Sequence, residues 1–281
     1  APAMPVSDDA LLDALELSPF LGAEVPGRLT RLPLPGVLGR VTDLSHPFAN
    51  LVGAATLDEA STPATIAAVC RRFASRGHAF GWLVGPKSTP HTLRAHLIAA
   101  GFSLADELAG LVRRELHRPV PANPAIRIRE ATPEDIPAAN RVLERADALP
   151  EAVADLLNQA LFLAGGPGRP RAYLAYIEGD PEPAGFASWT PIPGQPIIVL
   201  DGAATVVPHQ RKGVYTSLVA RRLADGRAYG AEAAVIQAVR GTSAPICERL
   251  GFTELGAFEL FAWQPGPPPE VWGGSRPSRR T

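Results

Sequence analysis

Residues 206–215 read VVPHQRKGVY, and this stretch predicts more about the fold than any other part of the chain. An apolar, extended run enters a polar turn at Gly213, and the turn opens directly onto a helix predicted for residues 214–227. The first backbone N–H groups of a helix have no partner inside the helix, and the helix dipole places positive charge at the same end. Arg211 and Lys212 add two fixed positive charges there. The stretch therefore predicts a binding site for a phosphate group.

The composition favours a soluble chain with two domains. The 281 residues are 46% apolar, which is enough for two hydrophobic cores. The formal net charge of −1 gives no reason to expect a nucleic acid or an acidic membrane surface as partner. Cys70 and Cys247 are too few for a disulfide framework and have no metal-ligand spacing. Because the sequence shows neither a membrane-length apolar run nor a charged-then-apolar leader, we expect a cytoplasmic protein without a metal.

A change in composition marks the boundary between the two predicted domains. Residues 119–124 contain three prolines, which favour extended, linker-like backbone. We therefore predict one domain over residues 1–118 and a second over residues 125–264. Residues 265–281 are rich in proline, glycine and arginine and have little to bury, so we expect a disordered tail.

The two predicted domains end in the same order of elements: helix, glycine, strand, short helix, Gly-Phe, strand. A Gly-Phe pair alone can arise by chance, but the whole ordered series indicates a tandem duplication. The matching segments are residues 63–75, 80–84 and 101–102 in the first domain, and residues 214–227, 233–238 and 251–252 in the second.

The second domain also contains clear strand and helix patterns ahead of the predicted phosphate site. Thr132, Pro133 and the two acids that follow are typical of a helix start. The order is strand, two helices, three strands, then helix, strand, helix and strand, which predicts a mixed α/β fold of the α+β type. The expected strands are residues 126–130, 173–177, 185–189, 197–207 and 233–238, and a further helix is expected at residues 151–163.

Two segments resemble a known family. Residues 207–215 resemble the coenzyme loop of GNAT-type N-acetyltransferases, whose signature is Gln/Arg-x-x-Gly-x-Gly/Ala. Residues 243–252 (SAPICERLGF) are similar to the Ser-x-x-x-Tyr-x-x-x-Gly-Phe segment of that family. The resemblance covers residues 126–263 and implies two tandem GNAT-like acyl-CoA N-acyltransferase domains. The first domain has no such loop before its helix at residues 63–75, so we expect it to be a degenerate copy in a monomeric pseudo-dimer or a homodimer.

The resemblance implies acetyl-CoA as the acyl donor and places its binding residues. The backbone of Val206 and Val207 would pair with the pantetheine arm, and the loop and first helical turn would hold the pyrophosphate. An ordinary polar turn before a helix is the alternative. Tyr215 stands where the signature has a small residue, so its ring would crowd the pyrophosphate unless it turns towards the core. The expected coenzyme residues are Val206, Val207, Gln210, Arg211, Lys212, Gly213, Val214, Tyr215 and Thr216.

Two residues are candidates for catalysis. Asp201 precedes the loop on the same strand, where some family members carry a carboxylate that accepts the proton of the amine. A solvated or turn-forming aspartate beside Gly202 is the alternative. Cys247 stands where the family often has the tyrosine that protonates the departing thiolate. Its thiol has an ordinary pKa of about 8.5 and can act as an acid, but a free cysteine is often a small buried apolar residue.

These features lead to two functional hypotheses. The first is an N-acetyltransferase that moves an acetyl group to a primary amine of a small molecule or a peptide. The second is a non-catalytic module that binds or senses acyl-CoA. A P-loop nucleotide site is excluded, because Lys212 precedes Gly213 and no Gly-Lys-Ser/Thr sequence follows.

Overall fold

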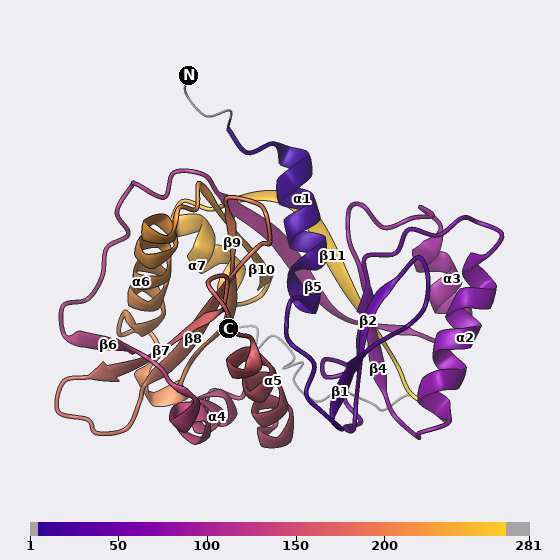
Figure 1. Cartoon of the computed structure of the whole chain (residues 1–281), viewed down its shortest axis with the longest axis horizontal. Helices are drawn as coiled ribbons and strands as arrows, with labels where there is room; N and C mark the ends of the chain where they lie inside the picture. The colour runs from indigo at the N-terminus through magenta and orange to yellow at the C-terminus, as the bar shows by residue number, and fades with distance from the viewer. Residues whose placement is uncertain (1–4, 268–281) are drawn as a thin grey trace.

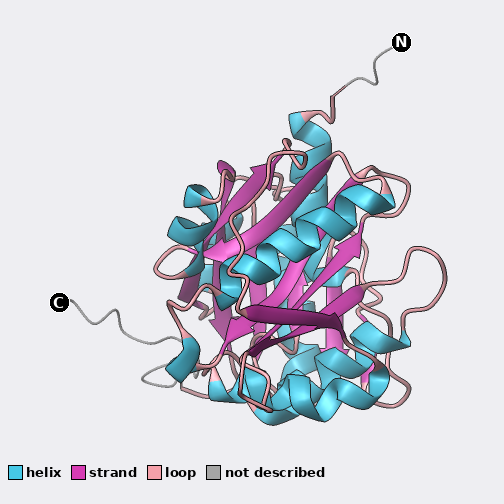
Figure 2. Cartoon of the chain, turned by 90° about the vertical axis from the view of Figure 1, so that its left-hand side faces the viewer, coloured by secondary structure: helices cyan, strands magenta, loops and turns pink. Residues whose placement is uncertain are grey.

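The computed structural model describes residues 5–267, which form one mixed sheet of eleven strands with helices on both faces (Figures 1 and 2). The order across the sheet is β1-β2-β3-β4-β11-β5-β10-β9-β8-β7-β6. The strands are β1 (Leu29–Arg31), β2 (Leu38–Thr42), β3 (Leu51–Gly53), β4 (Phe80–Val84), β5 (Ser103–Arg113), β6 (Ile126–Glu130), β7 (Arg171–Ile177), β8 (Gly185–Pro191), β9 (Ile197–Thr205), β10 (Ala233–Val239) and β11 (Thr253–Trp263). This confirms the predicted mixed α/β fold. The predicted disordered tail lies, apart from residues 265–267, outside the described residues.

Helices pack against different parts of this sheet. The longest, α6, lies on β8 and β9, α7 lies on β10 and β5, and α1 lies on β9, β10, β5 and β11. In Figure 1, α2 and α3 cover the right-hand part of the molecule, and α1 stands between the two parts. The α-helices are α1 (Asp8–Leu17), α2 (Thr62–Ala74), α3 (Leu93–Ala99), α4 (Ile136–Arg145), α5 (Glu151–Leu163), α6 (Val214–Tyr229) and α7 (Ser243–Arg249), with short 3-10 turns η1 (Ser18–Phe20), η2 (Pro133–Asp135) and η3 (Val207–His209).

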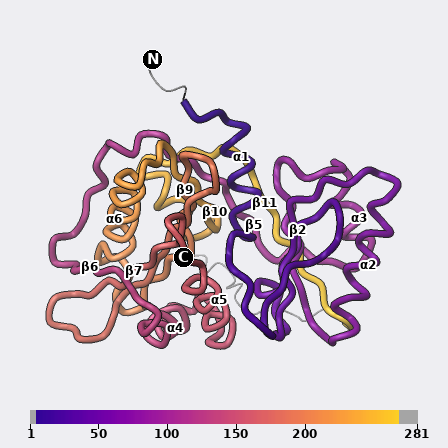
Figure 3. Tube along the Cα trace, in the orientation of Figure 1, coloured from indigo at the N-terminus to yellow at the C-terminus, as the bar shows by residue number. Residues whose placement is uncertain are grey.

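The last strands of the two halves exchange places in the sheet. Strand β5 from the N-terminal half pairs with β10, with Val112 opposite Val235, and strand β11 pairs with β4, with Phe261 opposite Trp82. Strands β5 and β11 also pair antiparallel with each other through the middle of the molecule (Figure 3). Each half therefore completes the other's part of the sheet, and the predicted domains at residues 1–118 and 125–264 share one continuous sheet.

The topology repeats around this exchange. In the N-terminal half β3 and β4 are parallel and are followed by α3 and β5, and in the C-terminal half β9 and β10 are parallel and are followed by α7 and β11. Helices α2 and α6 connect the two parallel pairs. The order predicted from the two Gly-Phe series is thus present in both halves.

Most of the predicted elements are present, with differences at their ends. Strands β4 and β6 and helix α5 have the predicted bounds, whereas the strand predicted to reach residue 207 ends at Thr205. The helix start predicted at Thr132 is present and forms a capping box with Asp135, but its first turn is the 3-10 turn η2. Helix α1 and strands β1–β3 were not predicted. Strands β1 and β3 have only three residues each, which is too short for a periodic pattern.

We expect Phe261→Ala to lower the free energy of unfolding by about 3–5 kcal/mol, because truncating a buried phenylalanine leaves a cavity. Phe261 belongs to the last strand of the chain, yet it is 0% exposed and packs in the core of the N-terminal half. Since the exchanged strands couple the halves, circular dichroism and tryptophan fluorescence should follow one shared transition in denaturant. Thr253→Ala, at an exposed position of the same strand, is the control. Two separate transitions would contradict the coupling.

Candidate functional site

Strands β9 and β10 separate partway along their length. Their pairing ends at Val199 opposite Val235. Beyond this point β9 pairs only with β8, as far as Thr205, and β10 pairs only with β5. We call the separated segments, residues 200–205 and 236–239, the β9–β10 splay. Along the splay the two strands no longer bond to each other, so an extended ligand with amide groups can pair with the main-chain groups that side chains leave open.

The corresponding strands of the N-terminal half do not separate in this way. After Val52 pairs with Trp82, a further bridge joins Thr56 to Thr89. The amide of Leu57 donates to Thr89 O at 3.2 Å, and the amide of Thr89 donates to Ala55 O at 2.9 Å. The chain itself thus supplies the hydrogen bonds that the β9–β10 splay leaves open. Asp58 and Glu59 also place negative charge just before α2, which disfavours an anion there.

The turn before α6 presents a row of free amides. Gly213 caps the helix in a left-handed conformation (φ +83°) and provides no side-chain cap. The first helical bond runs from the amide of Ser217 to Gly213 O at 3.0 Å. The hydrogen bonds of the described chain give no acceptor to the amides of residues 211–216. The predicted phosphate-binding end of α6 therefore has its donors available.

The backbone of the two valines before the turn is used unequally. The amide of Val206 donates to Ala184 O at 2.9 Å, and its carbonyl accepts from the amide of His209 at 2.9 Å. The side chain of Val206 is buried, whereas Val207 is 44% exposed. Of the two, Val207 is consequently the residue with an amide free to meet a ligand. The amide of Gln210 is engaged with Val207 O at 3.3 Å.

Asn123, in the connection between the halves, holds this turn in place. Its Nδ2 donates to Lys212 O at 2.9 Å, and its amide donates to the Ser217 hydroxyl at 2.9 Å. A Cβ on Gly213 would lie 3.1 Å from the Cβ of Asn123, so both the φ value and the space favour glycine. On sequence, Asn123 is only one residue of the proline-rich linker. An asparagine among prolines is a common turn-stabilising residue and was the available signal.

Arg211 and Lys212 are both exposed beside the free amides. Arg211 adopts a left-handed conformation (φ 64°), which is uncommon for a residue with a side chain. The Nζ of Lys212 lies 3.3 Å from His209 Nδ1, and His209 Nε2 lies 3.2 Å from Asp180 Oδ2. The positive charge at the turn is therefore only partly balanced.

Tyr215 turns away from the free amides and towards the core. Its hydroxyl lies 3.3 Å from the Sγ of Cys247, and its ring packs at the edge of the larger core cluster. Because α6 lies on β9 and α7 lies on β10, this contact joins the two helices on either side of the splay. Burial raises the pKa of the Tyr215 hydroxyl and of the Cys247 thiol, so both stay protonated at neutral pH.

Asp201 lies on β9 just beyond the last residue that pairs with β10. Side chains two residues apart on a strand point to the same face, so Asp201 shares the face of Val199, which α1 covers. Gly202 follows with a left-handed φ of +53°. Burial raises the pKa of Asp201 to about 7, although a hydrogen bond from Thr190 Oγ1 at 2.9 Å and the charges of Arg222 and Arg40 act in the opposite direction. A carboxyl group with this pKa can exchange protons at neutral pH.

The N-terminal half contributes Arg40 to the surroundings of Asp201. The guanidinium of Arg40 donates to Ala49 O at 3.0 Å and to Pro19 O at 2.7 Å, which fixes its position. Trp189 on β8 is 1% exposed and donates to the Tyr173 hydroxyl at 2.9 Å. Trp189 is therefore part of the core.

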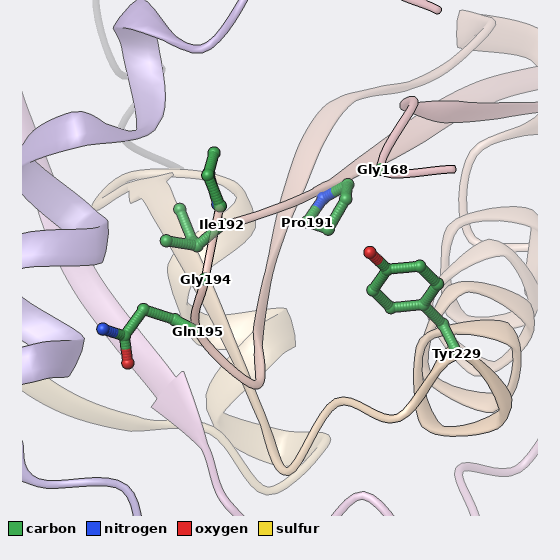
Figure 4. Close-up of a pocket in the computed structure, with 7 residues that line it drawn as sticks. Gly168, Pro191, Ile192, Gly194, Gln195 and Tyr229 are labelled. Carbon is green, nitrogen blue, oxygen red and sulfur yellow. The ribbon is translucent and has the colours of Figure 1, made fainter. Parts of the chain in front are cut away.

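Two surface hollows lie away from the turn. One, of about 380 Å³, is lined by residues at the β8–β9 turn together with Gly168 and Tyr229, at the C-terminal end of α6 (Figure 4). Another, of about 460 Å³, lies between α6 and residues 116–120. Within residues 5–267 no group of three His, Cys, Asp or Glu side chains is placed to hold a metal ion, and no helix is long and apolar enough to span a membrane.

Comparison with solved structures identifies the fold. No protein-family model and no curated protein matches this chain. A GCN5-related N-acetyltransferase from Kribbella flavida superposes with a TM-score of 0.65 and 20% identity, over 94% of this chain and 98% of that one. A tandem GNAT protein from the clavulanic acid biosynthesis pathway, without AcCoA, gives 0.58 and 13%, over 95% and 98%. A GCN5-related N-acetyltransferase from Sphaerobacter thermophilus gives 0.58 and 12%, over 84% and 79%. The chain has the GNAT N-acetyltransferase fold in a tandem arrangement.

We expect Asp201→Asn to stabilise the protein at pH 8 and to have little effect at pH 4. Between the ordinary pKa of 3.8 and the folded value of about 7, the folded protein holds a proton that the unfolded chain releases. The stability of the native protein therefore falls as the pH rises through this window, and the asparagine variant lacks this loss. The difference should approach about 4 kcal/mol at pH 8, because the shift from 3.8 to about 7 is roughly three pKa units of about 1.4 kcal/mol each. Denaturant unfolding at a series of pH values measures it, and a difference independent of pH would contradict the raised pKa.

Proposed function

We propose that this chain is an N-acetyltransferase that transfers the acetyl group of acetyl-CoA to a primary amine of a small molecule or a peptide. The observation that carries the proposal is the β9–β10 splay, which leads to the uncapped first turn of α6. The equivalent strands in the N-terminal half remain joined, so the chain provides one such site. The tandem GNAT fold supports an acyl-CoA-dependent acyltransferase.

The turn and the splay fit the two ends of a coenzyme with a phosphate group and an amide-bearing arm. The free amides of residues 211–216 and the charges of Arg211 and Lys212 suit a pyrophosphate. The amide of Val207 is available to the arm at the end of β9. Tyr215 leaves room at the amides because its ring is directed towards Cys247.

The proposed reaction needs a base for the amine and a proton for the leaving sulfur. Asp201, whose pKa of about 7 lies near neutral pH, would accept a proton from the attacking amine, and Thr190 holds its carboxyl group in place. The amine nitrogen then bonds to the acyl carbon as the carbon–sulfur bond breaks, and the electron pair moves to sulfur. The protonated thiol of Cys247 is a candidate donor to that thiolate, since burial raises its pKa.

A non-catalytic acyl-CoA-binding or sensing protein is the second candidate. The buried phenol beside Cys247 and the fully engaged backbone of Val206 favour it, because both reduce the polar groups available for chemistry. Thiol release from acetyl-CoA with a panel of small amines and amine-bearing peptides separates the two. Release above the rate of hydrolysis supports the enzyme, and binding without release supports the sensor.

We expect the double variant Arg211→Glu/Lys212→Glu to weaken CoA binding at least tenfold, because it replaces two positive charges beside the free amides with negative ones. Isothermal titration calorimetry measures the affinity. Arg71→Glu/Arg76→Glu makes the same change of net charge at exposed positions near the end of α2, and it should bind CoA normally. Equal affinity in both double variants would refute the coenzyme site.

We expect Asp201→Asn to reduce kcat/KM for the amine about 10²–10⁴-fold at pH 7.5, because it removes the proposed base. CoA binding should not change. In the native enzyme the rate should rise with pH to a plateau above about pH 7, following deprotonation of Asp201. Asp106→Asn is the matched control, since Asp106 is a partly buried aspartate on β5 whose pKa is also raised by burial. A rate unchanged in Asp201→Asn would exclude Asp201 as the base.

A further inference from the structure

Arg222 is a buried cation with an unused donor. Its side chain lies beneath α6 and is 0% exposed. Its Nε donates to Leu218 O at 3.2 Å, and its Nη1 donates to Ser188 O and Asp201 O at 3.1 Å each. Its Nη2 is buried and has no hydrogen-bond partner in the described part of the chain. A buried charged donor without an acceptor is costly, which suggests that another molecule supplies the acceptor.

Arg222 is fixed at the position where β9 leaves β10. The register of β8 and β9 shifts between Phe186 and Ser188, and the bonds from Nη1 join both strands there. Asp201, one of its three carbonyl partners, lies two residues beyond Val199, the last residue of β9 that pairs with β10. Arg222 lies seven residues beyond Tyr215, or about 10 Å further along α6. Its bond to Asp201 O places the guanidinium beside β9 at the level where the pairing with β10 has ended.

The charge of Arg222 is not neutralised on its own side of the sheet. The ionisable groups that act on it are, in decreasing order, Tyr215, Cys247, Asp201 and Tyr173. Burial raises the pKa of Tyr215, Cys247 and Tyr173, so these three are neutral at neutral pH. The carboxyl group of Asp201 is on the opposite face, where it accepts from Thr190. The Tyr215 hydroxyl, which lies 3.3 Å from the Sγ of Cys247, is also close enough to interact with the guanidinium of Arg222.

We propose that Arg222 stabilises the thiolate of the coenzyme, with Nη2 as the donor to the sulfur. The inference rests on the proposed function, since it requires acyl-CoA in the splay. When the amine nitrogen bonds to the acyl carbon, the carbon–sulfur bond breaks and its electron pair becomes negative charge on sulfur. A guanidinium fixed by three carbonyl bonds needs no rearrangement to meet that charge, which is the condition for electrostatic stabilisation of a transition state. Arg222 would thus act as a catalytic residue through direct contact with the leaving group.

The ionisation of bound CoA tests this without any acceptor amine. Calorimetry first establishes saturating concentrations of CoA and of desulfo-CoA for each variant. The ultraviolet absorbance of the thiolate is then followed against pH, and the desulfo-CoA titration is subtracted to remove Cys70, Cys247 and the tyrosines. In the native protein the pKa of the bound thiol should lie at least about one pH unit below that of free CoA, because a nearby positive charge favours the thiolate.

Three variants make the assignment specific. Arg222→Gln should return the pKa of the bound thiol to that of free CoA. Arg222→Lys keeps the charge but has one nitrogen, so it should give an intermediate value. Arg221→Gln, at the next residue, removes a charge that pairs with Asp225 at 2.9 Å and should match the native protein.

The outcomes separate this inference from the proposed function. If neither CoA nor desulfo-CoA binds the native protein, the proposed function is overturned. If CoA binds and its thiol titrates as in free solution, or equally in native protein and Arg222→Gln, the role of Arg222 is overturned while the coenzyme site stands. If Arg222→Gln does not fold, two other comparisons test the role of Arg222. They are the pKa of the CoA thiol bound to the native protein against that of free CoA, and the pKa of the thiol bound to Arg222→Lys.

Discussion

The exchange of β5 and β11 is the constraint on which the rest of the structure depends. Strand β10 pairs with β5 from Ala234 to Val239, so its hydrogen bonds on one edge are complete without β9. This leaves β10 free to separate from β9 after Val235, while β9 stays attached to β8. The separation that creates the candidate site is thus supported by a strand from the other half of the chain. Strand β10 belongs to the C-terminal half and its partner β5 to the N-terminal half, so neither half alone contains this pair.

Both halves have the same topology, but the parallel strands β9 and β10 separate in the C-terminal half, whereas pairing is restored beyond β3 and β4 in the N-terminal half. Local residues decide this difference. In the N-terminal half Thr56 and Thr89 restore pairing beyond β3 and β4, and acids stand before α2. In the C-terminal half Gly213 allows the turn to end without a side-chain cap, and Asn123 fixes it from outside through Lys212 O. The fold provides two equivalent positions, but only the C-terminal one leaves helix amides and strand edges available together.

The sequence predicted the elements whose patterns are local. The turn at residues 206–213, the helix after it, and the bounds of β4, β6 and α5 follow from glycine positions, alternation and capping residues. The strand exchange was not predictable in this way, because β5 and β11 carry no local signal of their partners. Arg222 was missed for a similar reason: on sequence it is one of two adjacent arginines in a helix. Its burial depends on a register shift between β8 and β9. Asn123 and Arg40 act across long sequence separations that a single chain pattern does not contain.

The distribution of charge around β9 links these observations to the proposed chemistry. Asp201 has its side chain on the α1 face, where burial and Arg40 of the N-terminal half influence it, while its carbonyl oxygen is bound by Arg222 from the α6 face. One residue therefore connects a carboxyl group that can accept a proton with a guanidinium that can meet negative charge. Acyl transfer from a thioester to an amine needs both functions, because the nucleophile must lose a proton as the leaving group gains charge. Placing them on opposite faces of one strand keeps the guanidinium of Arg222 and the carboxyl group of Asp201 from forming a direct ion pair. The N-terminal half, through β5 and Arg40, and the connection between the halves, through Asn123, thus contribute to the surroundings of the candidate site.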